Sequence, residues 1–453
     1  MSKSKLAQSL VNPNYRRANA ADNLKHKKPS HLSWLFYCAE VRRRIMLVQE
    51  SISCILPSKQ TVMSSHEPFL TEIVNNPANM EPRLVYADWL IENGDPLGEF
   101  IQAQIELAGD CTPARKKELS RIQKSSKPKI PAKHKLAKQH LRKPEYRHGF
   151  IEHATIGLQA FIDHGKALCQ QYPLRSIQLT AGSNKMENLI ECAHLKHIEA
   201  IDFRSNDFDS QSVEVFANCE HFKNLRSVHF RSSNFGLPAA KAMANSKHLV
   251  KFESIEFSNN KQWNDDCMEA ICQSKTLGGL KRICLEGADL SRGFCKHLAS
   301  AKFRNSLESF EITFAEIGDN GLEELISNPF PNLKTLLLNA CDLSGKGLEF
   351  LCKNHKRLPK LTTLGLNFNA IDDRGAIALS KSEFLTQLLS VRMSQNELGL
   401  EGLKAIGGSP KRNKKTKFYL PKNKVRGGQL SHLIQLHGNF GSFDRDRVAA
   451  VRP

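Results

Sequence analysis

The stretches IEAIDFRSNDF at residues 198–208 and LTTLGLNFNAI at residues 361–371 share a spacing of apolar residues that decides the fold. Both follow the pattern L-x-x-L-x-L-x-x-N-x-L, in which isoleucine or phenylalanine can replace leucine. The first apolar position recurs nine times at spacings of 24 to 28 residues, with a degraded tenth copy around Phe418 and Leu420: Leu174, Ile198, Leu225, Phe252, Leu280, Leu307, Leu333, Leu361 and Leu388. Self-similarity at such a period indicates a repeat architecture.

Each copy of the pattern predicts a short strand, a turn and about ten residues with helical spacing, such as GKGLEFLC at 345–352. One unit cannot bury its apolar edge alone, whereas stacked units can, so the strands should align as a parallel sheet. A period of 27 to 28 residues leaves room for a full helix, and the sequence resembles the ribonuclease-inhibitor class of leucine-rich repeats over about residues 170 to 425. We therefore expect an α/β leucine-rich repeat solenoid, a horseshoe with the parallel sheet inside and helices outside, preceded by a small all-α module.

The asparagine of the pattern should hydrogen-bond to backbone groups that are left unpaired where each strand turns outward. Five copies have it: Asn206, Asn260, Asn369, Asn396 and Asn423. Gly182, Ala288 and Ala315 occupy the position in other copies and cannot make these bonds. Because Ala288 and Ala315 fall in adjacent repeats, we expect the ladder of repeats to be least regular there, with water satisfying the turn.

Charge divides the chain of 453 residues into parts. The composition, 40% apolar and 25% charged, is globular but too long for one core, and the formal net charge is +19. Residues 1–62 contain 11 Lys and Arg against 3 acids, residues 111–148 contain 13 against 2, and residues 410–453 contain 11 against 2, whereas residues 63–110 contain nine acids against one Arg. We expect a disordered basic extension at 1–62, a small acidic helical module at 63–110, a Lys/Arg-rich helical linker at 111–148, the solenoid with its entry cap at 149–425 and a basic tail at 426–453.

Residues 67–108 predict three short helices, and Gly94, Asp95 and Pro96 suit the end of the second and the start of the third. The strings RLVYADWL at 83–90, NGD at 93–95 and GEFI at 98–101, followed by Gln104, resemble the bacterial repeat-companion domain, a module placed before leucine-rich repeats. The resemblance implies a bacterial protein with this architecture and implies no reaction. Members of that family begin just before the module, so Met63 is a better start than Met1, and residues 1–62 should be dispensable for folding.

Tyr86, Asp88 and Trp89 in this module are open to two interpretations. They could form a binding patch, or they could be core aromatics beside an acid paired with Arg83. We favour the second because large aromatic side chains are usually buried. The acidic surface of the module is either solvated or a docking site for the basic stretch that follows it.

The twelve cysteines are spread over the chain without a C-x-x-C pair or a nearby group of histidines. This pattern predicts free thiols and no metal site, and free thiols favour a reducing compartment. The apolar stretches at 34–39 and 45–56 are too short or too interrupted for a signal peptide or a membrane span. We therefore expect a cytoplasmic protein that needs no cofactor and makes no membrane contact.

Extended concave surfaces suit protein binding, and this is the function that the repeats favour. The outward-facing strand positions contain no aromatic anchor, so the affinity should be modest or the energetic hot spot should lie on flanking loops. A monomer that binds a protein partner of unknown identity is expected, with these concave residues as contact candidates: Asp202, Arg204, His229, Arg231, Glu256, Arg282, Glu286, Glu311 and Arg392.

Binding of nucleic acid or another polyanion is the second hypothesis, because a run of cations could neutralise several phosphates. The candidate residues are Arg115, Lys116, Lys117, Arg121, Lys124, Lys133, Lys138 and Arg142. Aromatic residues for base stacking are scarce there, which ranks this hypothesis lower. We predict no enzyme, because the sequence contains no nucleophile elbow, glycine-rich phosphate loop or metal-spaced cluster.

The residue directly after the first apolar position alternates in charge over seven consecutive repeats: Arg175, Glu199, Arg226, Glu253, Lys281, Glu308 and Lys334. Equivalent positions on neighbouring parallel strands lie about 4.8 Å apart, so each charge should have opposite charges beside it. We expect a structural ladder that favours correct stacking of the repeats.

Overall fold

The computed structural model describes residues 66–180, 186–203, 208–231 and 235–424, and for Arg231 the backbone only. The chain separates into two compact units, Met1–Glu67 and Pro68–Pro453, and the second is described below. The expected extension at 1–62 and tail at 426–453 lie outside the described residues, as do Gly182, Arg204 and Asn206.

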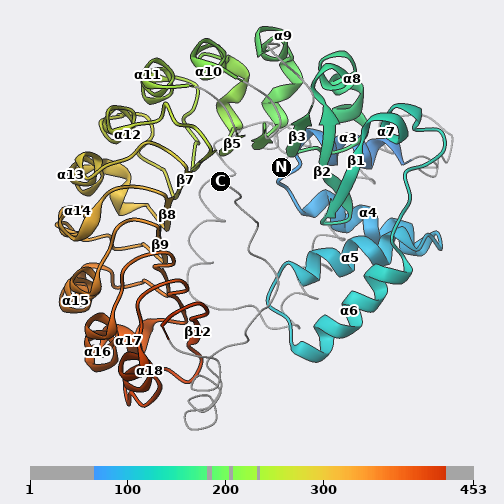
Figure 1. The fold of residues 1–453 in the computed structure, drawn as a ribbon. Helices are drawn as coiled ribbons and strands as arrows, with labels where there is room; N and C mark the ends of the chain where they lie inside the picture. Colours follow the sequence, from blue (N-terminus) through green and yellow to red (C-terminus); the bar gives the residue numbers. More distant parts are fainter. Residues whose placement is uncertain (1–65, 181–185, 204–207, 232–234, 425–453) are drawn as a thin grey trace, which may run out of the picture. The chain divides into compact units, whose positions relative to one another are not determined.

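One sheet runs through the second unit in chain order, β1 to β12, and forms the inner layer of the solenoid in Figure 1. All pairs of neighbouring strands are parallel except β1 and β2, which are antiparallel. The strands are β1 (Arg142–Arg147), β2 (Phe150–Gly157), β3 (Ser176–Thr180), β4 (Ala200–Asp202), β5 (Ser227–Arg231), β6 (Ser254–Ser258), β7 (Arg282–Glu286), β8 (Ser309–Thr313), β9 (Thr335–Asn339), β10 (Thr363–Gly365), β11 (Ser390–Arg392) and β12 (Lys417–Tyr419).

Helices form the outer layer, one or more after each strand from β2 to β11. The α-helices of the repeats are α8 (Leu158–Gln171), α9 (Met186–Ile190), α10 (Ser210–Ala217), α11 (Leu237–Asn245), α12 (Asp265–Cys272), α13 (Gly293–Ser300), α14 (Gly318–Leu325), α15 (Gly345–Lys353), α16 (Asp373–Lys381), α17 (Phe384–Gln387) and α18 (Leu400–Gly407). Short 3-10 helices are η2 (Ala193–His197), η3 (Glu220–Asn224), η4 (Lys302–Asn305) and η5 (His355–Arg357). The α/β solenoid expected from the repeat period is therefore confirmed.

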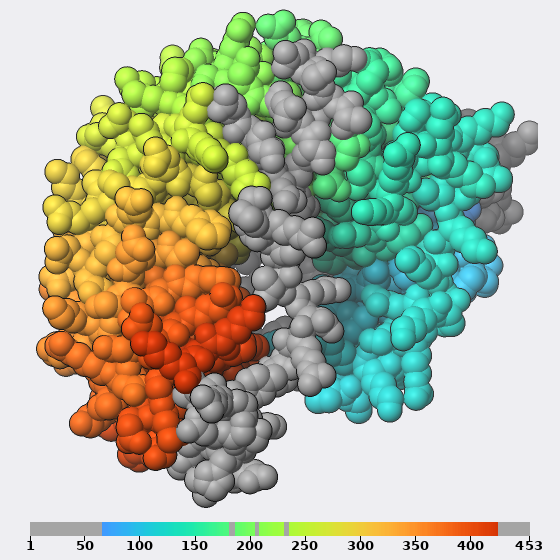
Figure 2. Space-filling model, viewed as in Figure 1, coloured from blue at the N-terminus to red at the C-terminus, as the bar shows by residue number. Residues whose placement is uncertain are grey.

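Alternation within each strand explains the two layers. In β6 the apolar Ile255 and Phe257 are buried, whereas Ser254, Glu256 and Ser258 are half-buried on the inner face. The buried residues of successive repeats join into one continuous core that runs from Ala137 to Leu420. Figure 2 shows neighbouring repeats packed against one another in the order of the chain. Each repeat is thus stabilised by apolar contacts with the next.

Asparagines close the turn after the strand as expected. Asn396 accepts a hydrogen bond from the Ile371 amide (2.9 Å) and donates to the Leu366 carbonyl (2.7 Å). Asn369 and Asn423 bond to backbone groups in the same way.

The repeats without asparagine are as regular as the others, contrary to expectation. Strands β7 and β8, which precede Ala288 and Ala315, pair over five residues, whereas β10 and β11 pair over three. At Ala315 a backbone group takes part in the turn: the Ala315 amide donates to the Ala340 carbonyl (3.2 Å) of the next repeat. Backbone groups of adjacent repeats can thus satisfy one another where an asparagine is missing.

The acidic module forms the three expected helices, α3 (Glu67–Asn75), α4 (Glu81–Glu92) and α5 (Leu97–Leu107). Gly94 between the last two has φ +73°, the left-handed conformation that favours glycine at a helix end. The module has its own small apolar core, which includes Tyr86, Leu90 and Ile101 and extends to Phe150 of β2. The interpretation of Tyr86 as a core aromatic agrees with this burial.

The stretch expected to be a helical linker at 111–148 is only partly helical. It contains α6 (Pro113–Ser125) and α7 (Lys135–His140), but its last residues form β1 and begin the sheet. Gln104 of the module holds the β1–β2 turn, because its side chain donates to the Tyr146 carbonyl (3.1 Å) and accepts from the Gly149 amide (2.8 Å). The residues before the repeats are therefore joined to the sheet by specific contacts.

Candidate functional site

A row of residues crosses the inner face of the sheet, one from each strand from β4 to β12. Strand register places in this row Asp202, His229, Glu256, Cys284, Glu311, Leu337, Gly365, Arg392 and Tyr419. We call these residues the concave row. Of the concave candidates from the sequence, Asp202, His229, Glu256, Glu311 and Arg392 belong to it, whereas Arg282 and Glu286 lie at the two ends of β7.

An ion-pair network occupies the concave row at β5 to β8. Glu256 contacts His229 (3.4 Å) and Arg282 (2.9 Å), and Arg282 also contacts Glu311 (3.0 Å). Ser309 donates a further hydrogen bond to Glu311 (2.8 Å). Burial alone would lower the pKa of Arg282, but the charges of Glu311 and Glu256 raise it overall. Arg282 therefore holds two carboxylates in place on a surface that remains partly exposed.

Cys284 lies within this network without the properties of a nucleophile. Burial raises the pKa of its thiol to about 12, and the nearby carboxylates of Glu311 and Glu256 act in the same direction. A thiol with such a pKa stays protonated near neutral pH and is a poor nucleophile and metal ligand. Among the described residues, no group of three or more His, Cys, Asp or Glu is arranged to hold a metal ion.

The inner face changes character along the solenoid. The inward positions of β6 to β8 contain Glu256, Glu286 and Glu311 with one cation, Arg282. The inward positions of β9 to β12 contain the cations Arg392 and Lys417 and no acid. Arg392 lies over the ring of Tyr419, with 5.7 Å from its guanidinium carbon to the ring centre. A partner that spans the face would therefore meet an acid-rich part and a cationic part.

The alternating charges at the edge of the sheet lie next to one another as expected. Ion pairs join Arg175 to Glu199 (2.7 Å), Arg226 to Glu253 (2.6 Å), Lys281 to Glu253 (2.9 Å) and Lys334 to Glu308 (2.6 Å), and Arg226 also approaches Glu199 (3.8 Å). A hydrogen bond from Lys334, together with the charge of Lys281, holds the pKa of Glu308 below its ordinary value. The column forms a nearly continuous ladder of opposite charges.

Reversing one charge of this ladder should destabilise the solenoid. The variant Glu253→Lys loses pairs with Arg226 and Lys281 and places three cations in a row, so we expect unfolding to become easier by about 1 to 2 kcal/mol. Leu389→Lys is the control, because Leu389 occupies the same column, is exposed and has the neutral Thr362 beside it. Chemical denaturation at low salt and at about 1 M salt measures the destabilisation by each variant, and the higher salt concentration should reduce the destabilisation by Glu253→Lys. Equal shifts for the two variants would show that the alternation contributes nothing.

The ladder continues into the module through a buried pair that the sequence did not reveal. Glu152 of β2 lies 3.7 Å from Arg175 and forms an ion pair with Arg83 of α4 at 2.7 Å, and both members of the pair are almost fully buried. Arg83 also donates to the Pro77 carbonyl (2.8 Å). The expected local pairing of Arg83 with Asp88 is therefore replaced by a long-range pair, and the exposed Asp88 accepts a hydrogen bond from Gln102 (2.7 Å).

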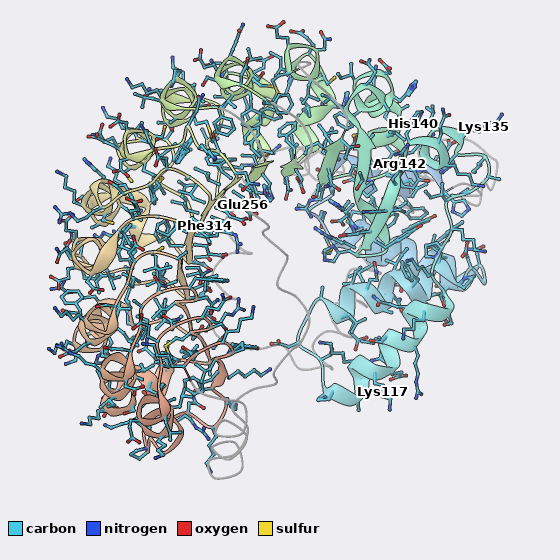
Figure 3. All side chains as sticks on the ribbon, viewed as in Figure 1. Lys117, Lys135, His140, Arg142, Glu256 and Phe314 are labelled. Atoms are coloured by element: carbon cyan, nitrogen blue, oxygen red, sulfur yellow. The ribbon has the colours of Figure 1, made fainter. Side chains whose placement is uncertain are left out.

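The basic candidates between the module and the repeats are mostly exposed. Arg115 is partly neutralised by ion pairs with Glu106 (2.7 Å) and Glu118 (2.9 Å). The others are exposed and form no ion pair with another described residue: Lys116, Lys117, Arg121, Lys124, Lys133, Lys138 and Arg142. Figure 3 shows Lys117 on α6 well apart from Lys135 and Arg142 on α7 and β1. The segment thus presents two separate basic surfaces.

Two exposed phenylalanines were not among the contact candidates from the sequence, because they lie outside the inward-facing strand positions. Phe314 and Phe368 follow β8 and β10, are 50% and 45% exposed, and have positive φ. Their spacing in the repeat, seven residues after the first apolar position, could have identified them. These two residues are the first candidates for the binding hot spot expected on the flanking loops.

Within residues 66–180, 186–203, 208–231 and 235–424, no helix has both the length and the apolar character needed to cross a membrane.

Comparisons with known proteins agree with this architecture. A family model described as Leucine Rich repeat matches residues 305–325 and 357–380. The ribonuclease inhibitor of Sus scrofa is 31% identical over 118 residues, covering 25% of this chain and 25% of that protein, and the ribonuclease inhibitor of Mus musculus is 25% identical over 184 residues, covering 33% and 40%. The matches thus span two fifths or less of the length of these relatives.

Among solved structures, the crystal structure of the Rad7 and Elc1 complex in yeast contains a similar chain. It matches with a TM-score of 0.48 and 13% identity, over 83% of this chain and 91% of that one. The matched repeats and the strand-turn-helix units show that the chain contains leucine-rich repeats, and the sequence similarity shows that these repeats are similar to those of ribonuclease inhibitors.

Proposed function

We propose that this protein binds another protein through the inner face of its sheet and that it catalyses no reaction. The observation that carries the proposal is the concave row, which the strand register aligns across nine strands and which is polar or charged except at Leu337 and Gly365. The network around Arg282 fixes several of these side chains before any partner arrives, which lowers the entropic cost of binding. The relatives named ribonuclease inhibitor act, by their name, on a protein, and this supports the same class of partner here.

The setting of this function is part of the proposal. We infer that residues 63–110 are a repeat-companion module of a bacterial protein and that the protein works as a monomer in the cytoplasm. Ten cysteines within the described residues are free thiols, which supports a reducing compartment. Contacts of Arg83 and Gln104 with β2 and the β1–β2 turn support a module that supplies the end of the solenoid.

A charge reversal in the concave row tests the proposal. Glu256→Lys should abolish the ion pair with Arg282 and repel a partner that binds the wild-type surface. In affinity capture from nuclease-treated lysate, we therefore expect the amount of at least one captured protein to fall tenfold or more. The matched control is Glu349→Lys on α15, because Glu349 also pairs with two cations, Lys353 (2.8 Å) and Arg374 (2.7 Å), but on the helical layer. Identical sets of captured proteins for both variants and the wild type would contradict binding through the inner face.

Polyanion binding remains a second candidate, supported by the exposed cations on α6 that form no ion pair with other described residues. If it occurs, the affinity for a labelled DNA duplex should fall with added salt at a log-log slope near −0.9 per neutralised phosphate. The double variant Lys116→Glu and Lys117→Glu should reduce that slope by about two units, measured by fluorescence anisotropy. Binding that does not respond to salt, or a slope unchanged by these substitutions, removes this candidate.

A further inference from the structure

Residues at one position of the repeat share an unusual backbone conformation. The residue directly before the asparagine position has positive φ in seven consecutive repeats: Asn259 (55°), Gly287 (66°), Phe314 (64°), Ala340 (49°), Phe368 (57°), Gln395 (53°) and Lys422 (60°). We call this set the exit column, because each member lies just beyond the inward-facing part of its strand. Glycine and asparagine adopt this conformation readily, whereas a bulky residue rarely does.

Phe314 and Phe368 are therefore costly choices for the exit column. Their backbone conformation is unfavourable for an aromatic residue, and their rings are about half exposed to water. Backbone strain of this kind is concentrated at functional sites and ligand clamps. Exposed large aromatics are also the side chains that supply most of the energy in protein interfaces. Figure 3 places Phe314 and Glu256 on the inner side of the sheet.

The two rings are separated by one repeat with a small residue. Phe314 and Phe368 follow β8 and β10, and Ala340 follows β9 between them. Neighbouring strands lie about 4.8 Å apart, so the two backbones are separated by roughly 10 Å. A space of that width, with only the methyl group of Ala340 between the two rings, suits one apolar side chain of a partner.

Hydrogen-bond donors lie beside the rings. The side-chain oxygens of Asn339 and Asn367 accept from the backbone amides of Asn367 (3.1 Å) and Ser394 (2.9 Å), so the NH2 groups are the parts of these side chains that can donate. Within the part of the chain that the structure describes, these NH2 groups have no acceptor. They can donate to the main-chain carbonyls of an extended segment.

The charge on the side of β11 and β12 selects the partner, because Phe314 follows β8, whose inward Glu311 belongs to the acid-rich part of the face. Inward positions of β9 to β12 contain Arg392 and Lys417 but no acid, and the exit column ends at the exposed Lys422. Complementary charge requires acidic residues in a segment that lies there. The same surface would repel a basic segment, which gives specificity as well as attraction.

We propose that Phe314 and Phe368, together with Arg392, Lys417 and the amides of Asn339 and Asn367, form a docking surface for an extended segment of a partner protein that inserts a bulky apolar side chain between the rings and places acidic residues over β11 and β12. This inference rests on the proposed function and names the chemistry of the partner and the place where its anchor binds.

Three fluorescein-labelled peptides of equal length test the docking surface on the full chain by fluorescence anisotropy. The first has a central phenylalanine with Asp and Glu on one side and neutral residues on the other, the second has alanine at the centre, and the third has Lys in place of every acid. We expect the first to bind at least tenfold more tightly than either of the others. Equal affinities for the three peptides, or no binding of the first, would overturn the proposal.

Variants separate the rings from the fold. The double variant Phe314→Asn and Phe368→Asn should weaken binding of the first peptide at least tenfold while its melting temperature stays the same or rises, because asparagine suits positive φ. Val250→Asn, which removes another exposed apolar side chain, is the control and should change neither quantity. Unchanged peptide binding by the double variant would overturn the docking surface, as would sedimentation showing a dimer of this chain that the double variant abolishes.

Capture from lysate distinguishes the two proposals. If Glu256→Lys loses the captured protein and the phenylalanine double variant keeps it, the docking surface is wrong and binding through the inner face stands. If both variants keep it, both proposals fail.

Discussion

Replacing Arg83 with alanine is expected to lower the free energy of unfolding by about 3 to 5 kcal/mol, as is typical when one partner of a buried ion pair is removed. The guanidinium is fully buried, forms an ion pair with Glu152 (2.7 Å), donates to the Pro77 carbonyl (2.8 Å) and lies over the ring of Phe150 (5.1 Å to its centre). Alanine leaves the carboxylate of Glu152 buried with its main partner gone, and it leaves a cavity. Urea denaturation followed by circular dichroism measures the change.

A double variant shows where that energy arises. Arg83→Met with Glu152→Leu removes both charges and keeps apolar volume, so it should cost clearly less than Arg83→Ala alone, because no buried charge is left unpaired. The exposed pair of Lys404 and Glu401 (3.1 Å) is the control, and Lys404→Ala should cost under about 1 kcal/mol. Equal destabilisation by Arg83→Ala and Lys404→Ala would show that the buried pair does not hold the module to the sheet.

Replacing Phe230 with alanine is expected to cost about 3 to 5 kcal/mol through lost burial and a residual cavity. Phe230 of β5 is buried and stacks on Phe203, directly after β4 (5.2 Å between ring centres), and it also contacts Phe257 of β6 (5.9 Å) and Phe235 (5.2 Å). The ring therefore joins three successive repeats. Calorimetry or urea denaturation of the variant gives the loss directly.

The control for Phe230 is another phenylalanine of the same solenoid. Phe314 is half exposed, so Phe314→Ala should change stability by less than about 1 kcal/mol. Because each repeat contacts only its neighbours, hydrogen exchange in Phe230→Ala should accelerate most in β4 to β6 and little in β10 to β12. Uniform acceleration over all strands would contradict a solenoid held together by nearest-neighbour packing.

The fold was predictable because its information is local and repeated. A pattern such as LTTLGLNFNAI indicates which residues point inward, where the strand ends and which asparagine side chain closes the turn. The structure shows the turn contacts for Asn369 and Asn396. Recurrence at a constant period then fixes the register of each strand on the next. The prediction that the repeats would be least regular at Ala288 and Ala315 was wrong. A backbone group of the neighbouring repeat can bond where a side chain is missing, as at Ala315, and the sequence of one repeat does not show this.

Contacts between distant segments were not predictable. Nothing near Arg83 in the sequence points to Glu152, because the two meet only when α4 packs beside β2. The last residues before the solenoid were read as a helical linker because they are rich in lysine, yet pairing with β2 makes Arg142–Arg147 a strand. Long-range packing overrides local propensity in both cases.

The candidate site was predictable as a list of residues but not as a surface. The sequence places Glu256, Arg282 and Glu311 on one face, and the structure adds that Arg282 bridges the two carboxylates. The separation into an acid-rich part and a cationic part became clear only from the order of the strands. The strand pattern identifies inward-facing strand positions only, and it therefore does not single out Phe314 and Phe368, whose exposed rings follow the strands.

Site-specific photo-crosslinking tests most directly whether the inner face binds a protein. A benzoylphenylalanine in place of Ser258, on the inner face of β6, and one in place of the exposed Lys296, on α13 of the helical layer, are compared in nuclease-treated lysate. Binding through the inner face predicts a discrete protein adduct from position 258 that Glu256→Lys suppresses, and none from position 296. Adducts of equal yield from both positions, or an adduct only from position 296, would contradict it.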